Sequence, residues 1–125
     1  FVEPTGLDPR NVSTANEYAV LASAILRSTA LQTIMAKISY SFRTANRNKP
    51  HTIKNTDILL SADISATAGK TGYLDEAGYT MALQTKPDAT HSFLTVVLGN
   101  SSSIGRYNDA KTVAQFAAEQ TTNPG

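Results

Sequence analysis

The most distinctive chemical feature of the sequence is the short segment at residues 69–73, Gly-Lys-Thr-Gly-Tyr. It is followed by Asp-Glu-Ala-Gly-Tyr at residues 75–79 and then by runs with strand character. A lysine supplies a compact positive charge, a threonine supplies a hydroxyl donor, and a glycine lets a ligand approach the backbone closely. On an extended segment, these residue types predict an edge that binds an anion.

Composition limits the classes of function that this edge can serve. The chain has 125 residues, which suits one domain with a hydrophobic core. Its 11 basic and 10 acidic side chains are nearly balanced, which argues against a dedicated binder of polyanions, nucleic acid included. Cysteine is absent, and His51 and His91 lie far apart without ligand spacing, so we expect neither a metal site nor a cofactor. No apolar run is long enough to cross a bilayer.

The first half of the chain is predicted to be mainly helical. Ser13 or Thr14 can cap a helix, and Glu17 stands where a capping box needs it, which predicts a helix over residues 14–27. A short helix at 29–35 and a strand at 37–42 follow. We expect a turn or hairpin over 43–54 with a return strand near Ile53, then a capped turn at 55–60 and a loop at 61–69.

The second half is predicted to form a sheet and one helix. Three strands are expected at about 68–74, 79–85 and 91–98, antiparallel because their links are short, with a turn glycine at Gly78. A helix over 107–120 and a tail over 121–125 complete the chain. This order predicts an α+β fold, an antiparallel sheet with packed helices. The aromatic residues expected in the core are Tyr18, Tyr40, Phe42, Phe93 and Phe116, with both histidines at the surface.

Two stretches carry a resemblance to a known family. Residues 1–8, Phe-Val-Glu-Pro-Thr-Gly-Leu-Asp, and residues 69–79 resemble the serine-type D-alanyl-D-alanine carboxypeptidases, the low-molecular-mass penicillin-binding proteins of the peptidase S11 type. The segments at residues 13–15, 55–60 and 96–99 are also similar to segments of that family. The Gly-Arg pair at residues 105–106 resembles the turn before its last helix. The resemblance implies that the chain is part of a β-lactamase/transpeptidase-like fold.

The same resemblance implies a hydrolase that acts on peptidoglycan stem peptides ending in D-Ala-D-Ala and reacts with β-lactams. Lys70 and Thr71 would hold the terminal carboxylate, and the N–H of Tyr73 would be one oxyanion donor. Gly72 would lie along the bound peptide, and Arg106 would be a second carboxylate contact. The alternative for Lys70 is a solvated strand-end lysine, and for Arg106 an exposed arginine before a helix. The implied location is periplasmic or extracellular, at the cell envelope.

The chain departs from the family in one respect. Neither Ser-x-x-Lys nor Ser-x-Asn, the companions of Lys-Thr-Gly, occurs in its 125 residues. We interpret residues 1–125 as the C-terminal portion of a catalytic domain without nucleophile or base, inactive alone. Its partners would be the missing N-terminal part of that domain or a second copy of the chain. The alternative hypothesis is a non-catalytic peptide-binding or scaffold module derived from the family.

Overall fold

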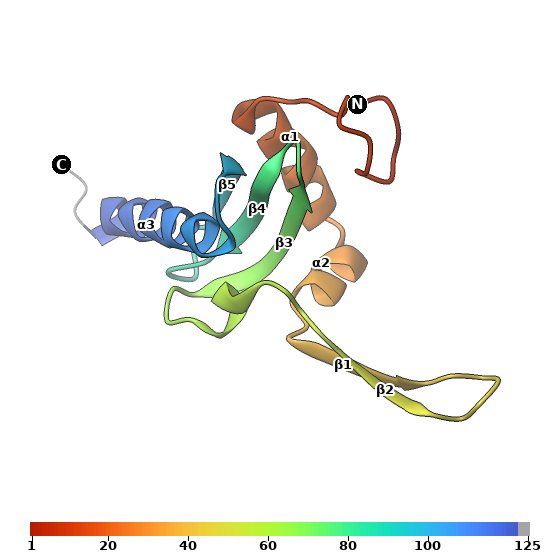
Figure 1. Cartoon of the computed structure of the whole chain (residues 1–125). Helices are drawn as coiled ribbons and strands as arrows, with labels where there is room; N and C mark the ends of the chain where they lie inside the picture. The colour runs from red at the N-terminus through yellow and green to blue at the C-terminus, as the bar shows by residue number, and fades with distance from the viewer. Residues whose placement is uncertain (123–125) are drawn as a thin grey trace.

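The computed structural model describes residues 1–122 as an antiparallel sheet with helices on both of its faces (Figure 1). The elements in chain order are α1 (Ala15–Leu26), α2 (Thr29–Met35), β1 (Ser39–Arg43), β2 (Pro50–Lys54), the 3₁₀ helix η1 (Ile58–Ser61), β3 (Ala66–Leu74), β4 (Gly78–Thr85), β5 (Phe93–Asn100) and α3 (Ser103–Thr122). Strands β3, β4 and β5 form one antiparallel sheet in that order, and β1 pairs with β2 in a separate hairpin. The predicted α+β class is confirmed.

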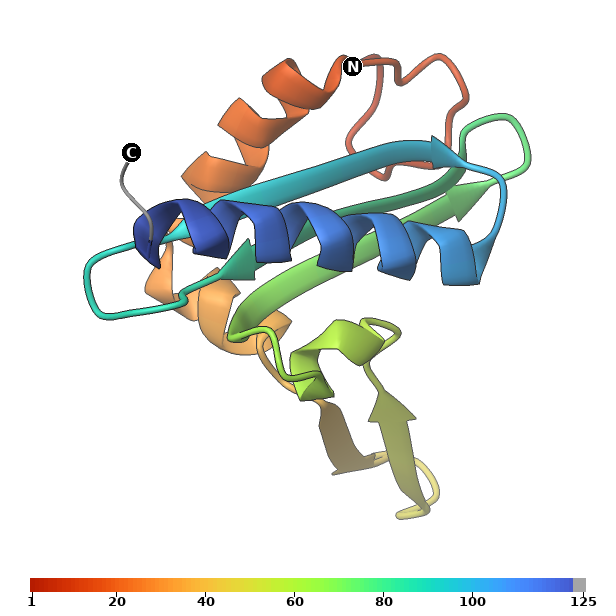
Figure 2. The same ribbon diagram turned by 90° about the vertical axis from the view of Figure 1, so that its left-hand side faces the viewer.

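The main core lies between the sheet and α3. Figure 2 shows α3 lying over the sheet and running roughly along its strands, and it contacts both β4 and β5. The core cluster consists of Leu59, Met81, Leu83, Tyr107, Ala110 and Ala114. On the opposite face of the sheet, α1 packs against β5 and α2 against β3. Burial of the two faces fixes the sheet between the helix layers, because apolar area removed from water is the main stabilising contribution.

Local signals at the helix starts explain where α1 and α3 begin. The Thr14 hydroxyl accepts from the N–H of Glu17 at 3.2 Å, and the Glu17 carboxylate accepts from the N–H of Thr14 at 3.0 Å. This capping box confirms the predicted start of α1. The Ser102 hydroxyl accepts from the N–H of Gly105 at 2.9 Å, so α3 begins at Ser103, earlier than the predicted residue 107.

Two other boundaries differ from the prediction. Strand β3 begins at Ala66, so part of the segment expected as a loop over 61–69 is strand. The small residues there suggested a loop, but their N–H and C=O groups pair with β4. The tail expected over 121–125 is helical at Thr121 and Thr122, and residues 123–125 lie outside the described residues. Gly78 has a φ of 67°, which confirms the turn glycine.

The prediction of an aromatic core was wrong for three of its five residues. Tyr40, Phe42 and Phe116 are 53%, 40% and 63% exposed, whereas Tyr18 and Phe93 are half-buried. Alternation along a strand shows which side chains share a face, but not whether another element covers that face. The expectation that both histidines lie at the surface is confirmed. Within residues 1–122, no helix is both long and apolar enough to cross a membrane.

Candidate substrate-binding strand

Residues 70–73 lie in the C-terminal half of β3, which is an edge strand of the sheet. Lys70 stands opposite Ala82 of β4, and Thr71 stands opposite Met81. One side of β3 is thus occupied by β4, and its other side pairs with no strand in the part of the chain that the structure describes. The segment is extended at a sheet edge, the geometry that an added peptide strand requires.

Lys70 and Thr71 point to opposite faces of the sheet. Direct cross-strand neighbours share a face, so Thr71 lies with Met81 on the side of α3, and Lys70 lies with Ala82 on the other side. Thr71 is 8% exposed, whereas Lys70 is exposed and its ammonium contacts the Thr71 carbonyl oxygen. A ligand that used both side chains would therefore have to lie along the strand edge between them.

A chain of hydrogen bonds connects the Thr71 hydroxyl to α3. The Thr71 and Thr56 hydroxyls are 2.5 Å apart, and the Thr56 carbonyl accepts from the Tyr107 hydroxyl. That hydroxyl in turn accepts from Nη2 of Arg106 at 2.7 Å. Because each member has a fixed partner, the orientation of the Thr71 hydroxyl is set by residues outside its own strand.

Arg106 is a buried residue of α3, and its predicted place in a turn before the helix is wrong. It is 5% exposed, and its Nη1 donates to the carbonyl oxygens of Gly72 at 3.1 Å and Thr80 at 3.3 Å. The guanidinium also lies 4.5 Å from the ring centroid of Tyr107 and 5.4 Å from that of Tyr79. The side chain thus joins α3 to both β3 and β4, and its role as a direct carboxylate contact stays a prediction.

Tyr73 and Gly72 occupy the end of the candidate site. The Tyr73 ring packs against the Tyr79 ring with centroids 4.3 Å apart, and its hydroxyl donates to the Asp75 carboxylate at 2.5 Å. That hydrogen bond is the main cause of a raised pKa of the Tyr73 hydroxyl. The ring is therefore held in place by its neighbours, and its phenol stays protonated at neutral pH.

Asp57 is a buried residue next to the site that the sequence prediction missed. It is 3% exposed, and its Oδ1 accepts from the N–H of Leu59 at 2.9 Å and caps η1. Its Oδ2 has no hydrogen-bond partner among the residues that the structure describes. Burial raises the pKa of Asp57, and the positive charge of Arg106 partly opposes this shift. The sequence predicted the capped turn, but burial of the capping carboxylate comes from β3 passing over it.

Asp57→Asn is expected to stabilise the chain at neutral pH. The pKa of Asp57 is higher in the folded state than in the unfolded state. The free energy of unfolding therefore falls as pH rises above the unfolded-state pKa, because the buried carboxylate becomes charged. Asparagine can still cap η1 but carries no charge, so we expect the free energy of unfolding to rise by about 1 kcal/mol at neutral pH. Thermal melts over a pH series measure it. The gain should shrink as pH falls toward 3.8, the ordinary pKa of an aspartate, and a gain that persists or grows in acid contradicts the assignment.

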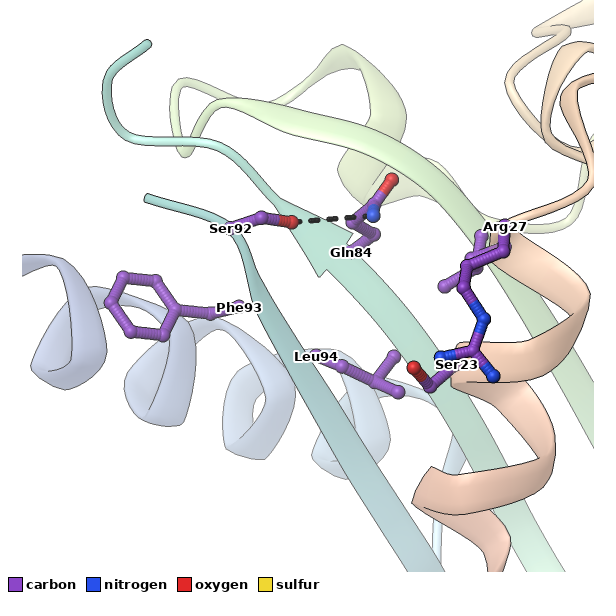
Figure 3. A pocket seen from close by; sticks show the side chains of 7 residues that line it. Ser23, Arg27, Gln84, Ser92, Phe93 and Leu94 are labelled. Atoms are coloured by element: carbon purple, nitrogen blue, oxygen red, sulfur yellow. Dashed lines mark hydrogen bonds between the residues drawn. The ribbon is translucent and has the colours of Figure 1, made fainter. Parts of the chain in front are cut away.

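Two cavities in the described residues lie elsewhere. One, of about 160 Å³, lies between α1 and the end of the sheet, where Figure 3 shows Ser23 and Arg27 near Gln84 and Ser92. Gln84 donates to the Ser92 hydroxyl at 3.3 Å. None of the seven lining residues is a carboxylate or an imidazole that could activate a hydroxyl. The other, of about 520 Å³, lies beside the β1–β2 hairpin.

The comparison with protein families decides what this strand belongs to. The model of the peptidase S11 family, described as D-alanyl-D-alanine carboxypeptidase, matches residues 1–102. The chain belongs to the peptidase S11 family. The matched region includes residues 70–73, whereas Arg106 and Tyr107 lie beyond it.

Individual relatives of this peptidase S11 chain agree with the family match. It is 29% identical over 114 residues to a D-alanyl-D-alanine endopeptidase of Haemophilus influenzae, covering 90% of this chain and 38% of that protein. A mutant of a Streptomyces DD-transpeptidase superposes with a TM-score of 0.76 at 26% identity, covering 87% of this chain and 44% of that one. A D-alanyl-D-alanine carboxypeptidase of Mycobacterium tuberculosis gives 0.69 at 25% identity, covering 90% and 42%.

These matches confirm the penicillin-binding type of fold predicted for this S11 chain. The chain spans less than half the length of each of these relatives. Among residues 1–122, no three histidine, aspartate or glutamate side chains gather where they could hold a metal ion.

Proposed function

We propose that β3 binds the terminal carboxylate and backbone of a peptidoglycan stem peptide ending in D-Ala-D-Ala, as one wall of a serine peptidase cleft. The observation that supports this most is the place of Lys-Thr-Gly at an open edge strand in an S11 chain. The peptide would pair with the free side of β3 as an added strand, with its terminal carboxylate near Lys70 and Thr71.

Each residue of the strand has a separate role in this proposal. The Lys70 ammonium provides positive charge, and the Thr71 hydroxyl donates a hydrogen bond whose direction Thr56 sets. Gly72 lets the peptide backbone lie close to the strand, and the Tyr73 N–H is one oxyanion donor. Arg106 acts mainly as a positioning residue, because its Nη1 already holds the Gly72 and Thr80 carbonyl groups. A contact between Nη1 and the carboxylate would need a change of these partners.

The proposed reaction is acyl transfer. A serine attacks the carbonyl between the two D-alanines, the terminal D-alanine leaves, and water hydrolyses the acyl-enzyme. The sequence of this chain contains no Ser-x-x-Lys and no Ser-x-Asn. We propose that residues 1–125 form part of one catalytic domain whose nucleophile and base lie on other polypeptide, either the rest of that domain or a second copy. Its substrate places it at the cell envelope, outside the cytoplasm.

A fluorescent penicillin is expected not to label the 125-residue chain covalently. Labelling requires a nucleophilic serine with an adjacent base, and the sequence carries neither family motif. The measurement is gel fluorescence after denaturation, with a complete S11 carboxypeptidase as the positive control. A label that survives denaturation and maps to a serine of this chain contradicts the assignment of the nucleophile to other polypeptide.

Lys70→Ala is expected to weaken binding of a D-Ala-D-Ala peptide about 10-fold to 100-fold, because a hydrogen bond to a charged group contributes about 1.5–3 kcal/mol. Titration followed by NMR should shift the amide signals of residues 70–73 in the parent chain. The control is Lys86→Ala, an exposed lysine just beyond β4, which should leave the titration unchanged. Equal losses in the two variants, or no shifts in residues 70–73, argue against β3 as the binding strand.

A further inference from the structure

The β1–β2 hairpin is an extended projection from the part of the chain that the structure describes (Figure 1). Every residue of Ser39–Arg43 and Pro50–Lys54 is exposed. Figure 1 shows the hairpin extending away from the sheet and its helices, and Figure 2 shows it at the opposite side of the molecule from the N-terminus. A two-stranded hairpin without packing partners is marginally stable in water. We therefore ask what partner the two faces of the hairpin contact.

One face of the hairpin is aromatic and aliphatic. The register places Tyr40 opposite Ile53 and Phe42 opposite His51, so these four side chains share a face. The Tyr40 and Phe42 rings stack with centroids 6.2 Å apart, and the Phe42 and His51 rings stack at 5.5 Å. The other face is polar: the Ser41 and Thr52 hydroxyls are 2.8 Å apart there, and the same register places Arg43 and Lys54 on it. The hairpin is thus amphipathic, with its apolar face exposed.

The charge of this part of the chain is strongly one-sided. Residues 18–56 contain six of the eleven basic side chains and none of the ten acidic ones. Five of those basic residues lie on or next to the hairpin: Lys37, Arg43, Arg47, Lys49 and Lys54. The near-zero net charge of the whole chain conceals this asymmetry, because the remaining residues carry an excess of acid. A local basic surface of this kind attracts an anionic partner.

A cavity at the base of the hairpin combines both properties. It has a volume of about 520 Å³, and Ile34, Tyr40 and Ile53 provide its apolar lining, with Lys37 and Lys54 beside them. The Lys37 ammonium lies 5.9 Å from the centroid of the Tyr40 ring. A hollow with apolar walls and two ammonium groups at its lining suits an acyl chain below an anionic headgroup.

We propose that the β1–β2 hairpin docks on an anionic lipid bilayer. Tyr40, Phe42 and Ile53 enter the interfacial region, where amphipathic aromatic rings are favoured, and the basic side chains contact lipid phosphates. A soluble polyanion would neutralise the charge but leave the apolar face in water. A second copy would bring two basic hairpins together, which like-charge repulsion opposes. The proposal is independent of peptide binding by β3.

The insertion of the apolar face is tested with a tryptophan at its centre. The chain contains no tryptophan, so Phe42→Trp introduces a single reporter. Vesicles of equal parts phosphatidylglycerol and phosphatidylcholine should shift its emission to the blue, and brominated acyl chains should quench it. Vesicles of phosphatidylcholine alone should do neither. The control is Phe116→Trp, at an exposed site on α3, which should stay unshifted and unquenched.

The role of charge is tested with two pairs of exposed residues. Arg47→Gln with Lys49→Gln should weaken binding to the anionic vesicles about 30-fold, since each basic residue near such a surface contributes about 1 kcal/mol. Lys86→Gln with Lys111→Gln removes the same charge elsewhere and should change the affinity little. Three results would each overturn the proposal. The first is an equal loss of affinity in both pairs, and the second is sedimentation with vesicles while the Phe42→Trp emission stays unshifted. The third is binding of polyphosphate without binding of vesicles.

Discussion

Arg106→Ala is expected to lower the free energy of unfolding by about 3–5 kcal/mol, a large part of the 5–15 kcal/mol typical of a domain. The guanidinium is 5% exposed and is the shared donor to the carbonyl groups of Gly72 in β3 and Thr80 in β4. Removing it leaves those acceptors without this partner and opens a space against the Tyr79 and Tyr107 rings. Urea denaturation measures the change.

The control for this substitution is an exposed arginine. Arg10→Ala removes a guanidinium that is 76% exposed and pairs with Asp8 at 2.6 Å, and surface pairs contribute only about 0–1 kcal/mol. Arg106→Lys should fall between the two, because one ammonium cannot reproduce the planar set of donors. If Arg106→Ala and Arg10→Ala unfold at the same urea concentration, the contacts of Arg106 with β3 and β4 do not contribute to the stability of the chain.

Loss of Arg106 should also act on the neighbouring carboxyl group. The positive charge of Arg106 lowers the pKa of Asp57, although burial raises it more. In the alanine variant this opposing influence is absent, so the pKa of Asp57 should rise further and the stability should fall more steeply with pH above the unfolded value. The two residues are thus coupled, and their effects on stability should not be additive.

The sequence predicted those parts of the fold whose causes are local. The capping box of Thr14 and Glu17 closes within one helical turn, and the positive φ of Gly78 belongs to the short turn between β3 and β4. Placement of residues 70–73 on a strand likewise follows from the alternation and links around them. Such signals depend on residues a few positions apart, which is why they can be read from the chain alone.

The parts that the sequence did not predict depend on contacts between distant residues. Arg106 joins carbonyl groups 34 and 26 positions away, and Tyr107 donates to a carbonyl 51 positions away. Burial of Asp57 likewise requires β3 to lie over it, which no local pattern encodes. The exposed hairpin shows the converse, since the alternation around Tyr40 is that of a half-buried strand although all five residues of β1 are exposed in the described structure.

Gly69→Ala is expected to destabilise the chain by about 2–4 kcal/mol, because forced overpacking costs about 1–3 kcal/mol and a lost helix cap about 1 more. A β-carbon at residue 69 would stand 1.9 Å from Oδ2 of Asp57 and 3.3 Å from the Ala82 carbonyl oxygen. The Asp57 side chain cannot easily move away, because it is buried and its Oδ1 accepts a hydrogen bond from the N–H of Leu59 that caps η1. Thermal unfolding should show a drop of about 10 °C for a chain of this size.

Gly72→Ala and a double substitution distinguish this clash from a general intolerance of β3 to side chains. At residue 72 the new β-carbon would meet the Thr80 hydroxyl at 2.6 Å, a group that can rotate away, so the cost should be clearly smaller. Asp57→Ala removes the atoms that Gly69→Ala would strike, so the double variant should lose less stability than the two single losses together. Equal losses for the two glycines, or simple additivity with Asp57→Ala, contradict the packing of Asp57 against β3.

Because Asp57 and the Thr71 hydroxyl lie under the same strand, that packing also determines how firmly the candidate binding edge is held.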